Sequence, residues 1–103
     1  MNLVAIFFAG AFLCNCVPHA FSGLLGQPFP SPFSKPMGIG DSRPIVNFLW
    51  GFFNFLVGIS LLSRFPVDVG FNPHFITLMA GVLVMGLNLS IHFGSVRRSR
   101  AAA

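Results

Sequence analysis

Acidic side chains are almost absent from this chain. Its 103 residues include two aspartates, Asp41 and Asp68, and no glutamate. The motifs that carry common enzyme chemistry are also missing: there is no Ser-His-acid set, no phosphate-binding glycine loop and no HExxH sequence. We therefore expect no catalytic residues and no enzyme activity.

Charge of either sign is scarce, and it is excluded from long stretches. Charged residues make up 8% of the chain, hydrophobic residues make up 54%, and there are fourteen Phe but no Tyr. Residues 44–63 and 73–94 contain no Asp, Glu, Lys or Arg, and each run has about the length that a helix needs to cross a bilayer. A third uncharged run, residues 2–25, is interrupted by Pro18. The sequence predicts one all-α membrane domain with three transmembrane helices at about 2–25, 44–63 and 73–94, a Pro-rich loop at 26–43 and a basic tail at 95–103.

The first run could instead be a cleaved signal peptide. However, Met1 and Asn2 supply no leading positive charge, and residues 16–20 lack a small-x-small cleavage pattern. We expect this segment to be retained as a helix.

The basic residues predict the orientation. The first loop carries Lys35 and Arg43, and the tail on the same side carries three arginines, whereas the second loop has Arg64 alone. This bias places the C-terminus in the cytoplasm and the N-terminus outside. Asp41 and Asp68 then face opposite sides, which excludes a catalytic carboxylate pair.

The net charge of +4 is better explained by topology than by nucleic-acid binding, because no basic face with interleaved aromatic residues lies outside the spans.

Helix ends are marked in the second half of the chain. Asn72 followed by Pro73 is typical of an N-cap with proline in the first turn, and residues 41–44 offer a similar start through Asp41 and Pro44. Gly94 is the expected end of the third helix.

The first loop has prolines at positions 28, 30, 32 and 36, so we expect neither helix nor sheet there, and extended polyproline geometry in its first half. Its apolar residues Phe29, Phe33, Met37 and Ile39 are expected at the membrane interface or folded over the helix ends. Recruitment of a soluble domain by the proline spacing is the alternative.

Each predicted helix has a stripe of small and polar residues at spacings of three and four, with Met85 filling a gap in the third. The members are Ala11, Asn15, His19 and Ser22; Asn47, Gly51, Asn54 and Gly58; and Thr77, Gly81, Asn88 and His92. Small residues let membrane helices approach closely, and amides seek partners across the contact. The stripes therefore predict helix packing, with Gly51, Gly58, Thr77 and Gly81 as the packing positions.

A ligand site is the alternative for the polar members of these stripes. In the predicted orientation, His19, Asn47 and His92 converge in the cytoplasmic leaflet, and Asn15, Asn54 and Asn88 extend the line. Buried polar groups in a membrane are functional candidates, and this set could hold a small polar molecule, a lipid headgroup or a quinone ring.

Metal or haem binding by His19, His92, Cys14 or Cys16 is disfavoured. The two thiols of a Cys-x-Cys pair point about 200° apart on a helix, and no CxxCH motif is present. We expect no metal and no cofactor, and we interpret the cysteines as small apolar residues.

Residues 15–19, 26–33 and 47–54 resemble a pattern in small uncharacterised bacterial multi-span membrane proteins. This resemblance implies a bacterial inner membrane and assigns no activity. The sequence favours a protein that acts through helix contacts, as a homo-oligomer or an accessory subunit of a larger membrane complex, with lipid as its surroundings. Binding or transport of a small polar or amphipathic ligand is the second hypothesis.

Overall fold

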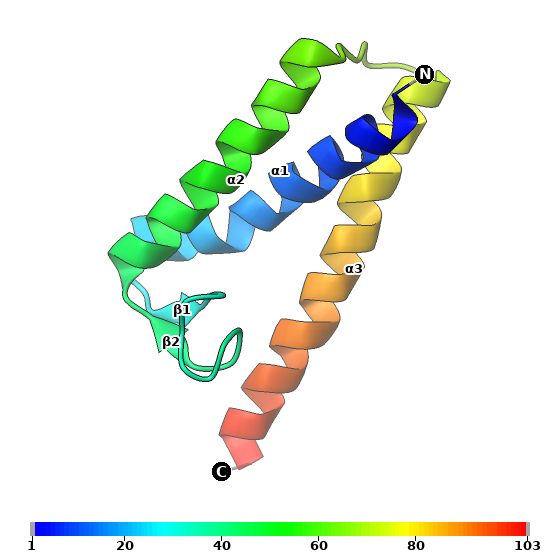
Figure 1. Ribbon diagram of the computed structural model, residues 1–103. Helices are drawn as coiled ribbons and strands as arrows, with labels where there is room; N and C mark the ends of the chain where they lie inside the picture. Colours follow the sequence, from blue (N-terminus) through cyan, green and yellow to red (C-terminus); the bar gives the residue numbers. More distant parts are fainter. Residues whose placement is uncertain (1, 103) are drawn as a thin grey trace.

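Three long helices dominate the computed structural model, which describes residues 2–102. They are α1 (Leu3–Leu24), α2 (Pro44–Arg64) and α3 (Pro73–Ala102), and each is long and apolar enough to cross a membrane. Figure 1 shows α1 lying between α2 and α3, and the loop between α1 and α2 folded below them. The predicted three-helix arrangement is confirmed at this level.

The predicted starts of α2 and α3 are confirmed, although one lacks its expected cap. The Asn72 side-chain oxygen accepts a hydrogen bond of 2.9 Å from the Phe75 amide, so Asn72 caps α3. Pro44 occupies the first turn of α2, but Arg43 stands at the N-cap position and makes no side-chain capping bond. At the start of α2, the fixed φ angle of Pro44 favours the helical conformation without a capping side chain.

The end of α3 was predicted wrongly. The helix continues through Gly94 to Ala102, so residues 95–102 are helical. One glycine inside a helix costs only about 1 kcal/mol. Burial of Val96 and an ion pair made by Arg100 stabilise the extra turns.

Glycines set how closely α1 approaches its two neighbours. A Cβ atom at Gly51 would overlap the backbone of Ala20, and one at Gly81 would overlap the backbone of Phe7. The buried residues of α2 are the four members of its predicted stripe: Asn47, Gly51, Asn54 and Gly58. This stripe packs on α1, as does Gly81 from α3, so these small residues are used within the chain.

The Pro-rich loop is folded, and the expectation that no sheet forms there was wrong. Strands β1 (Phe29–Pro30) and β2 (Asp41–Ser42) pair antiparallel, with Phe29 opposite Ser42. Proline tolerates such an edge position because a two-stranded pair does not require its missing N–H. We call residues 25–43 the cap.

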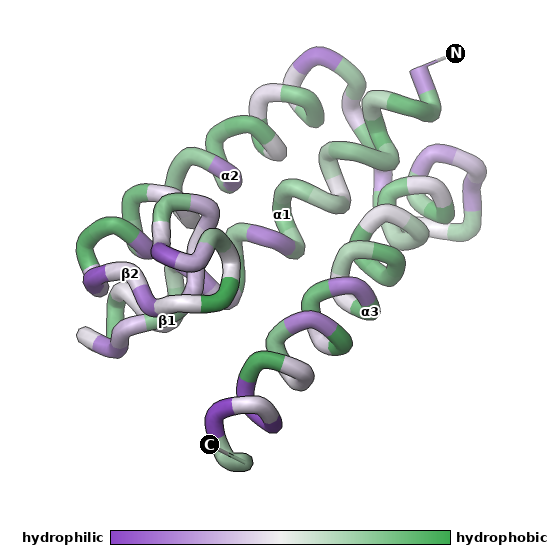
Figure 2. Tube along the Cα trace, turned by 60° about the horizontal axis from the view of Figure 1, so that its bottom comes forward, coloured by the Kyte–Doolittle hydropathy of each residue, from purple (hydrophilic) through white to green (hydrophobic). Residues whose placement is uncertain are grey.

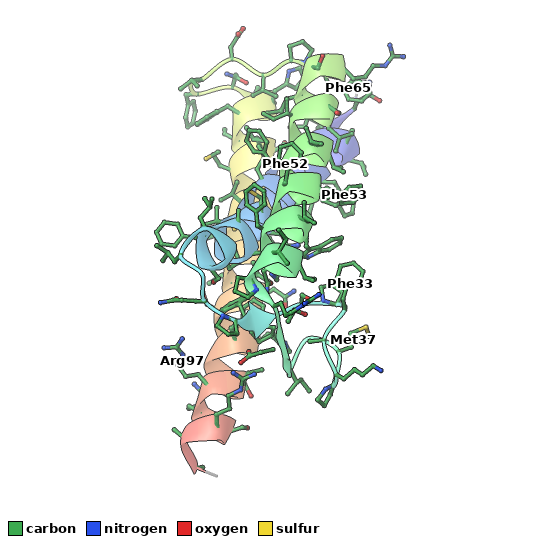
Figure 3. The ribbon with its side chains drawn as sticks, turned by 90° about the vertical axis from the view of Figure 1, so that its left-hand side faces the viewer. Phe33, Met37, Phe52, Phe53, Phe65 and Arg97 are labelled. Atoms are coloured by element: carbon green, nitrogen blue, oxygen red, sulfur yellow. The ribbon has the colours of Figure 1, made fainter. Side chains whose placement is uncertain are left out.

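Outside these contacts the helices are strongly apolar. Figure 2 shows hydrophobic residues along all three helices, with hydrophilic ones concentrated toward the ends and the cap. Large side chains such as Phe52 and Phe53 are about half exposed and project away from the bundle (Figure 3). Such a surface suits lipid better than water.

Candidate functional site

A buried histidine–asparagine pair joins α1 to α2. The His19 Nδ1 atom lies 2.9 Å from the Asn47 side-chain oxygen, and the two residues are 3% and 0% exposed. The Asn47 amide nitrogen donates to the carbonyls of Phe29 and Ser42, at 2.7 and 3.3 Å. Since both of those partners are acceptors, the Asn47 oxygen must accept from His19, and Nδ1 carries a proton. In the neutral imidazole, Nε2 is therefore left as an acceptor.

A second interhelical pair, formed by two amides, lies about one helical turn from His19 along α1 and about two turns from Asn47 along α2. The Asn15 side-chain amide donates to the Asn54 oxygen at 3.0 Å, and Asn54 donates to the Trp50 carbonyl at 2.8 Å. Asn54 is fully buried. The two interhelical pairs account for the polar members of the α2 stripe, and hydrogen bonds of this kind contribute about 0.6 to 2 kcal/mol each in membrane proteins.

Three aromatic rings surround the His19 imidazole. Phe29, Trp50 and Phe93 approach it edge-on, with ring centroids 5.7, 6.4 and 6.1 Å away. They come from the cap, α2 and α3, so residues from all three helices and the cap meet around this side chain. Phe29 thus folds back over the helix ends, one of the two placements expected for the apolar residues of this loop, whereas Phe33, Met37 and Ile39 are exposed.

The cap holds its shape through serine side chains. The hydroxyls of Ser31 and Ser42 lie 2.6 Å apart, and the Ser34 hydroxyl donates to the Ser31 carbonyl at 2.7 Å. All three serines are buried. Gly38 adopts a φ of 72°, which disfavours residues with a side chain and turns its carbonyl toward α3.

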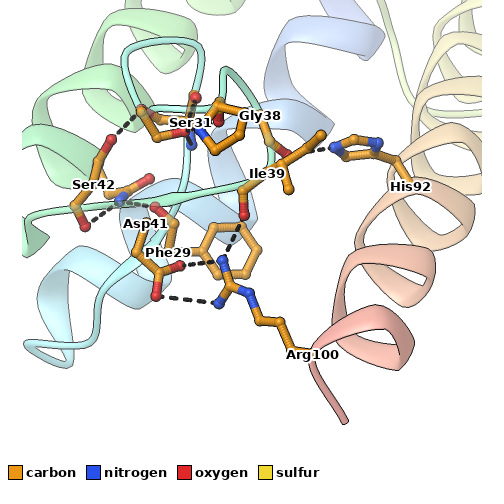
Figure 4. A network of polar contacts seen from close by, with 11 residues as sticks. Phe29, Ser31, Gly38, Ile39, Asp41, Ser42, His92 and Arg100 are labelled. Carbon is orange, nitrogen blue, oxygen red and sulfur yellow. Dashed lines mark hydrogen bonds and ion pairs between the residues drawn. The ribbon is translucent and has the colours of Figure 1, made fainter. Parts of the chain in front are cut away.

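Two polar side chains of α3, His92 and Arg100, bond to the cap, as Figure 4 shows. The His92 Nε2 atom lies 2.6 Å from the Gly38 carbonyl oxygen, so His92 donates from Nε2. Arg100 forms an ion pair of 3.0 Å with Asp41 and also donates to the Ile39 carbonyl. The pairing explains Asp41 better than the predicted capping role does.

These contacts leave an open pocket of about 410 Å³ between the helices and the cap. Its polar wall includes Asn15, His19, Ser31 and His92. Ring and aliphatic carbons from Trp50, Phe93 and neighbouring residues form the rest. The size and the mixture of apolar walls with a few polar groups are typical of small-molecule sites.

The structure brings together most of the predicted ligand residues, but not all. His19 and Asn47 bond directly, Asn15 and Asn54 form the deeper pair, and His92 shares the pocket while bonding to the cap rather than to Asn47. Asn88 lies exposed on α3, outside the pocket lining. The Thr77 hydroxyl donates to the Pro73 carbonyl in its own helix, at 2.7 Å, and its packing role stays a prediction.

Sequence reasoning missed Trp50 and the contacts of Ser31 and Gly38. Trp50 falls just beside the α2 stripe, and the presence of the single tryptophan next to a polar stripe was an available signal. The contacts of Ser31 and Gly38 depend on the fold of a proline-rich loop, for which no local pattern gives the partners.

Within residues 2–102, no three His, Cys, Asp or Glu side chains are grouped so that they could hold a metal ion. Cys14 and Cys16 are both free and half-buried.

Comparison with known proteins gives no family for this chain. No protein-family model matches it, and neither curated proteins nor solved structures yield a match. The resemblance to small bacterial membrane proteins therefore stays a prediction.

Proposed function

We propose that this chain is a multi-pass membrane protein that binds a small polar or amphipathic ligand in the pocket beside His19. The observation that carries the proposal is the convergence of Asn15, His19 and His92, from two helices, with Trp50 from the third beneath a folded cap. Packing alone does not require an open pocket of about 410 Å³ with polar groups in its wall, because protein interiors are otherwise close-packed. His19 is buried, and a polar side chain buried at membrane depth is a candidate for a functional site.

The proposed location is a bacterial inner membrane with the C-terminus in the cytoplasm. Lys35 and Arg43 belong to the cap or its edge, and the cap contacts the end of α3 that carries the remaining three tail arginines. Arg64 lies at the other end of α2. The charge bias favours cytoplasmic exposure of the cap, which puts the pocket in the cytoplasmic leaflet.

The test is to fill the pocket with protein atoms. Leu89 lines the pocket from α3, whereas Leu87 on the same helix is 55% exposed on the outer surface. The protein and its Leu89→Trp and Leu87→Trp variants are purified in mild detergent, and copurifying small molecules are identified by mass spectrometry. We expect a molecule present in the parent and in Leu87→Trp to fall at least tenfold in Leu89→Trp. Equal amounts of every copurifying molecule in all three proteins would refute the proposal.

An accessory role in a larger membrane complex is the second candidate, and exposed Asn88 favours it. An asparagine on the outer face of an apolar helix seeks a hydrogen-bonding partner, and a neighbouring membrane helix can supply one. Asn88→Leu should then release a copurifying partner or a second copy, whereas Leu87→Ala nearby should not. Retention of the same species by both variants would argue against α3 as the contact.

A further inference from the structure

The cap and the last turns of α3 enclose a small hollow in addition to the pocket described above. Its volume is about 100 Å³, well below the range of about 300 to 1,000 Å³ that is typical of pockets for drug-sized ligands. Asp41, Arg97 and Arg100 line it, and Phe29 and Phe93 form part of its apolar wall. The hollow therefore fits one small chemical group, and two guanidinium groups are at hand to bind it.

The charges that line the hollow are only partly compensated. Arg100 pairs with Asp41 at 3.0 Å, as Figure 4 shows, so these two charges offset each other. Arg97 is exposed and makes no hydrogen bond or ion pair with residues 2–102, and Figure 3 shows its side chain projecting from the lower part of α3. Arg100 also has N–H donors to spare, since a guanidinium carries five and here donates to Asp41 and the Ile39 carbonyl. An anion with several acceptor oxygens, such as a phosphate, complements this arrangement.

The length of α3 places this hollow at the depth of lipid headgroups. The helix has 30 residues and is therefore about 45 Å long, whereas the hydrocarbon core of a bilayer is about 30 Å thick. A crossing that begins at Pro73 uses about twenty residues for the core and leaves it near His92. The headgroup layer then adds about 5 to 7 Å, or about four to five residues of helix, which reaches Arg97.

Apolar side chains next to the hollow favour a lipid over a soluble anion. Leu24 and Leu25, at the end of α1, are 72% and 58% exposed, and Pro28 of the hollow follows them by only three residues. Exposed leucines beside a cationic site suit a molecule that has an acyl chain below its charged group. A free phosphate ion gains nothing from such neighbours.

From these observations we propose that the hollow binds the phosphate group of an anionic phospholipid. The phosphate oxygens accept from Arg97 and from the remaining donors of Arg100, and the acyl chains lie in the membrane toward Leu24 and Leu25. The charge of this end of the protein favours an anionic lipid over a zwitterionic one, because five basic residues face one acid there. The basic residues are Lys35, Arg43, Arg97, Arg98 and Arg100, and the acid is Asp41. This site is separate from the pocket of the proposed function, so either can be correct without the other.

The experiment measures which lipid the protein retains. Vesicles of equal parts phosphatidylglycerol and phosphatidylcholine are dissolved in mild detergent with the protein, which is then captured and washed, and the bound lipids are quantified by mass spectrometry. We expect the parent protein to enrich phosphatidylglycerol at least about fivefold, the factor that one arginine contributes near an anionic surface. No enrichment by the parent protein would overturn the inference.

Arg98→Gln is the matched control for Arg97→Gln. Both variants lose one positive charge from the same turn of α3, but Arg98 lies outside the lining of the hollow. We expect Arg97→Gln to lower the enrichment about fivefold and Arg98→Gln to lower it less than twofold. Equal losses in the two variants would show that the charge of the whole tail attracts the lipid, and the assigned site would be wrong.

Two further measurements test the source of the phosphate and the integrity of the fold. A wash with 20 mM inorganic phosphate should remove no more phosphatidylglycerol than sodium chloride of equal ionic strength; selective removal by phosphate would show a site for the soluble ion and refute the lipid assignment. Arg97→Gln should unfold in SDS like the parent protein, because Arg97 bonds to no other described residue. If this variant does not fold, the enrichment by the parent protein and the phosphate wash decide.

The same variants separate this inference from the proposed function. A molecule that is lost from Leu89→Trp and kept by Arg97→Gln occupies the pocket beside His19. A lipid that is lost from Arg97→Gln and kept by Leu89→Trp occupies the hollow.

Discussion

Gly51 is a position where a single added methyl group should destabilise the contact between α1 and α2. A Cβ atom there would lie 2.8 Å from both the Cα and Cβ atoms of Ala20, where carbon contacts normally measure about 3.5 to 4.0 Å. Backbone blocks the new atom, so α1 and α2 must separate by about 1 Å at this level. The adjacent His19–Asn47 bond, at 2.9 Å, would then stretch beyond hydrogen-bonding distance.

These two losses set the expected magnitude for Gly51→Ala. Overpacking costs about 1 to 3 kcal/mol, and the stretched hydrogen bond adds about 1 kcal/mol. We expect the free energy of unfolding to fall by about 2 to 4 kcal/mol. Gly58→Ala should cost less, because its Cβ meets mainly the Leu13 side chain, which can rotate away.

Gly86→Ala is the matched control. The nearest atom to its new Cβ would be the Cys14 sulfur at 3.6 Å, an ordinary contact, so the gain in helix propensity should dominate. We expect Gly86→Ala to be neutral or to stabilise by up to about 1 kcal/mol.

The measurement is reversible unfolding in mixed micelles with increasing SDS, followed by Trp50 fluorescence. The expected order of stability is Gly86→Ala, parent, Gly58→Ala, Gly51→Ala. If Gly51→Ala were as stable as Gly86→Ala, α1 and α2 would not be in backbone contact at Ala20, and the packing described here would be wrong.

The remaining predictions concern orientation, the polar pairs and the cap. A reporter fused after Ala103 should be active only if it works in the cytoplasm, and activity of a periplasm-dependent enzyme there would reverse the orientation. Asn47→Leu should destabilise more than Asn54→Leu in the SDS assay, because Asn47 bonds three partners and Asn54 two; the opposite order would contradict the described network. In a double-mutant cycle, Asp41→Asn with Arg100→Gln should give a coupling of about 1 kcal/mol or less, since the pair is exposed, and a coupling of 3 kcal/mol or more would mean that the pair is buried.

The α2 stripe shows what local spacing can predict. Asn47, Gly51, Asn54 and Gly58 interrupt a helix that is otherwise built from bulky apolar residues, so their shared face could only be a contact. The same reasoning was less successful on α3, where Gly81 is buried but Asn88 is exposed. Spacing defines a face, whereas the crossing of two helices decides how much of that face is covered. Helix α1 ends at Leu24, whereas α3 runs on to Ala102. The C-terminal members of the α3 stripe therefore extend beyond α1: His92 contacts the cap, and Asn88 is exposed.

The cap was beyond prediction for a different reason. Four prolines made the absence of regular structure a sound expectation, but they also stiffen the chain and lower the entropy lost on folding. Its contacts span large sequence separations, from Asn47 to the Phe29 carbonyl and from Arg100 to Asp41. No periodic pattern encodes such pairs, since each depends on where two helices end.

The contact between the cap and the end of α3 also constrains the membrane topology, independently of how the basic residues are distributed along the chain. Asp41 precedes α2 and Arg100 lies in the last turn of α3, yet their side chains lie 3.0 Å apart. Both residues must then be on the same side of a membrane, which requires that α2 and α3 both cross it or that neither does. Their length and hydropathy favour two crossings. The bias of basic residues predicts that this shared end faces the cytoplasm. The one acid within it pairs with Arg100, so Lys35, Arg43, Arg97 and Arg98 remain as the charges that favour this predicted orientation.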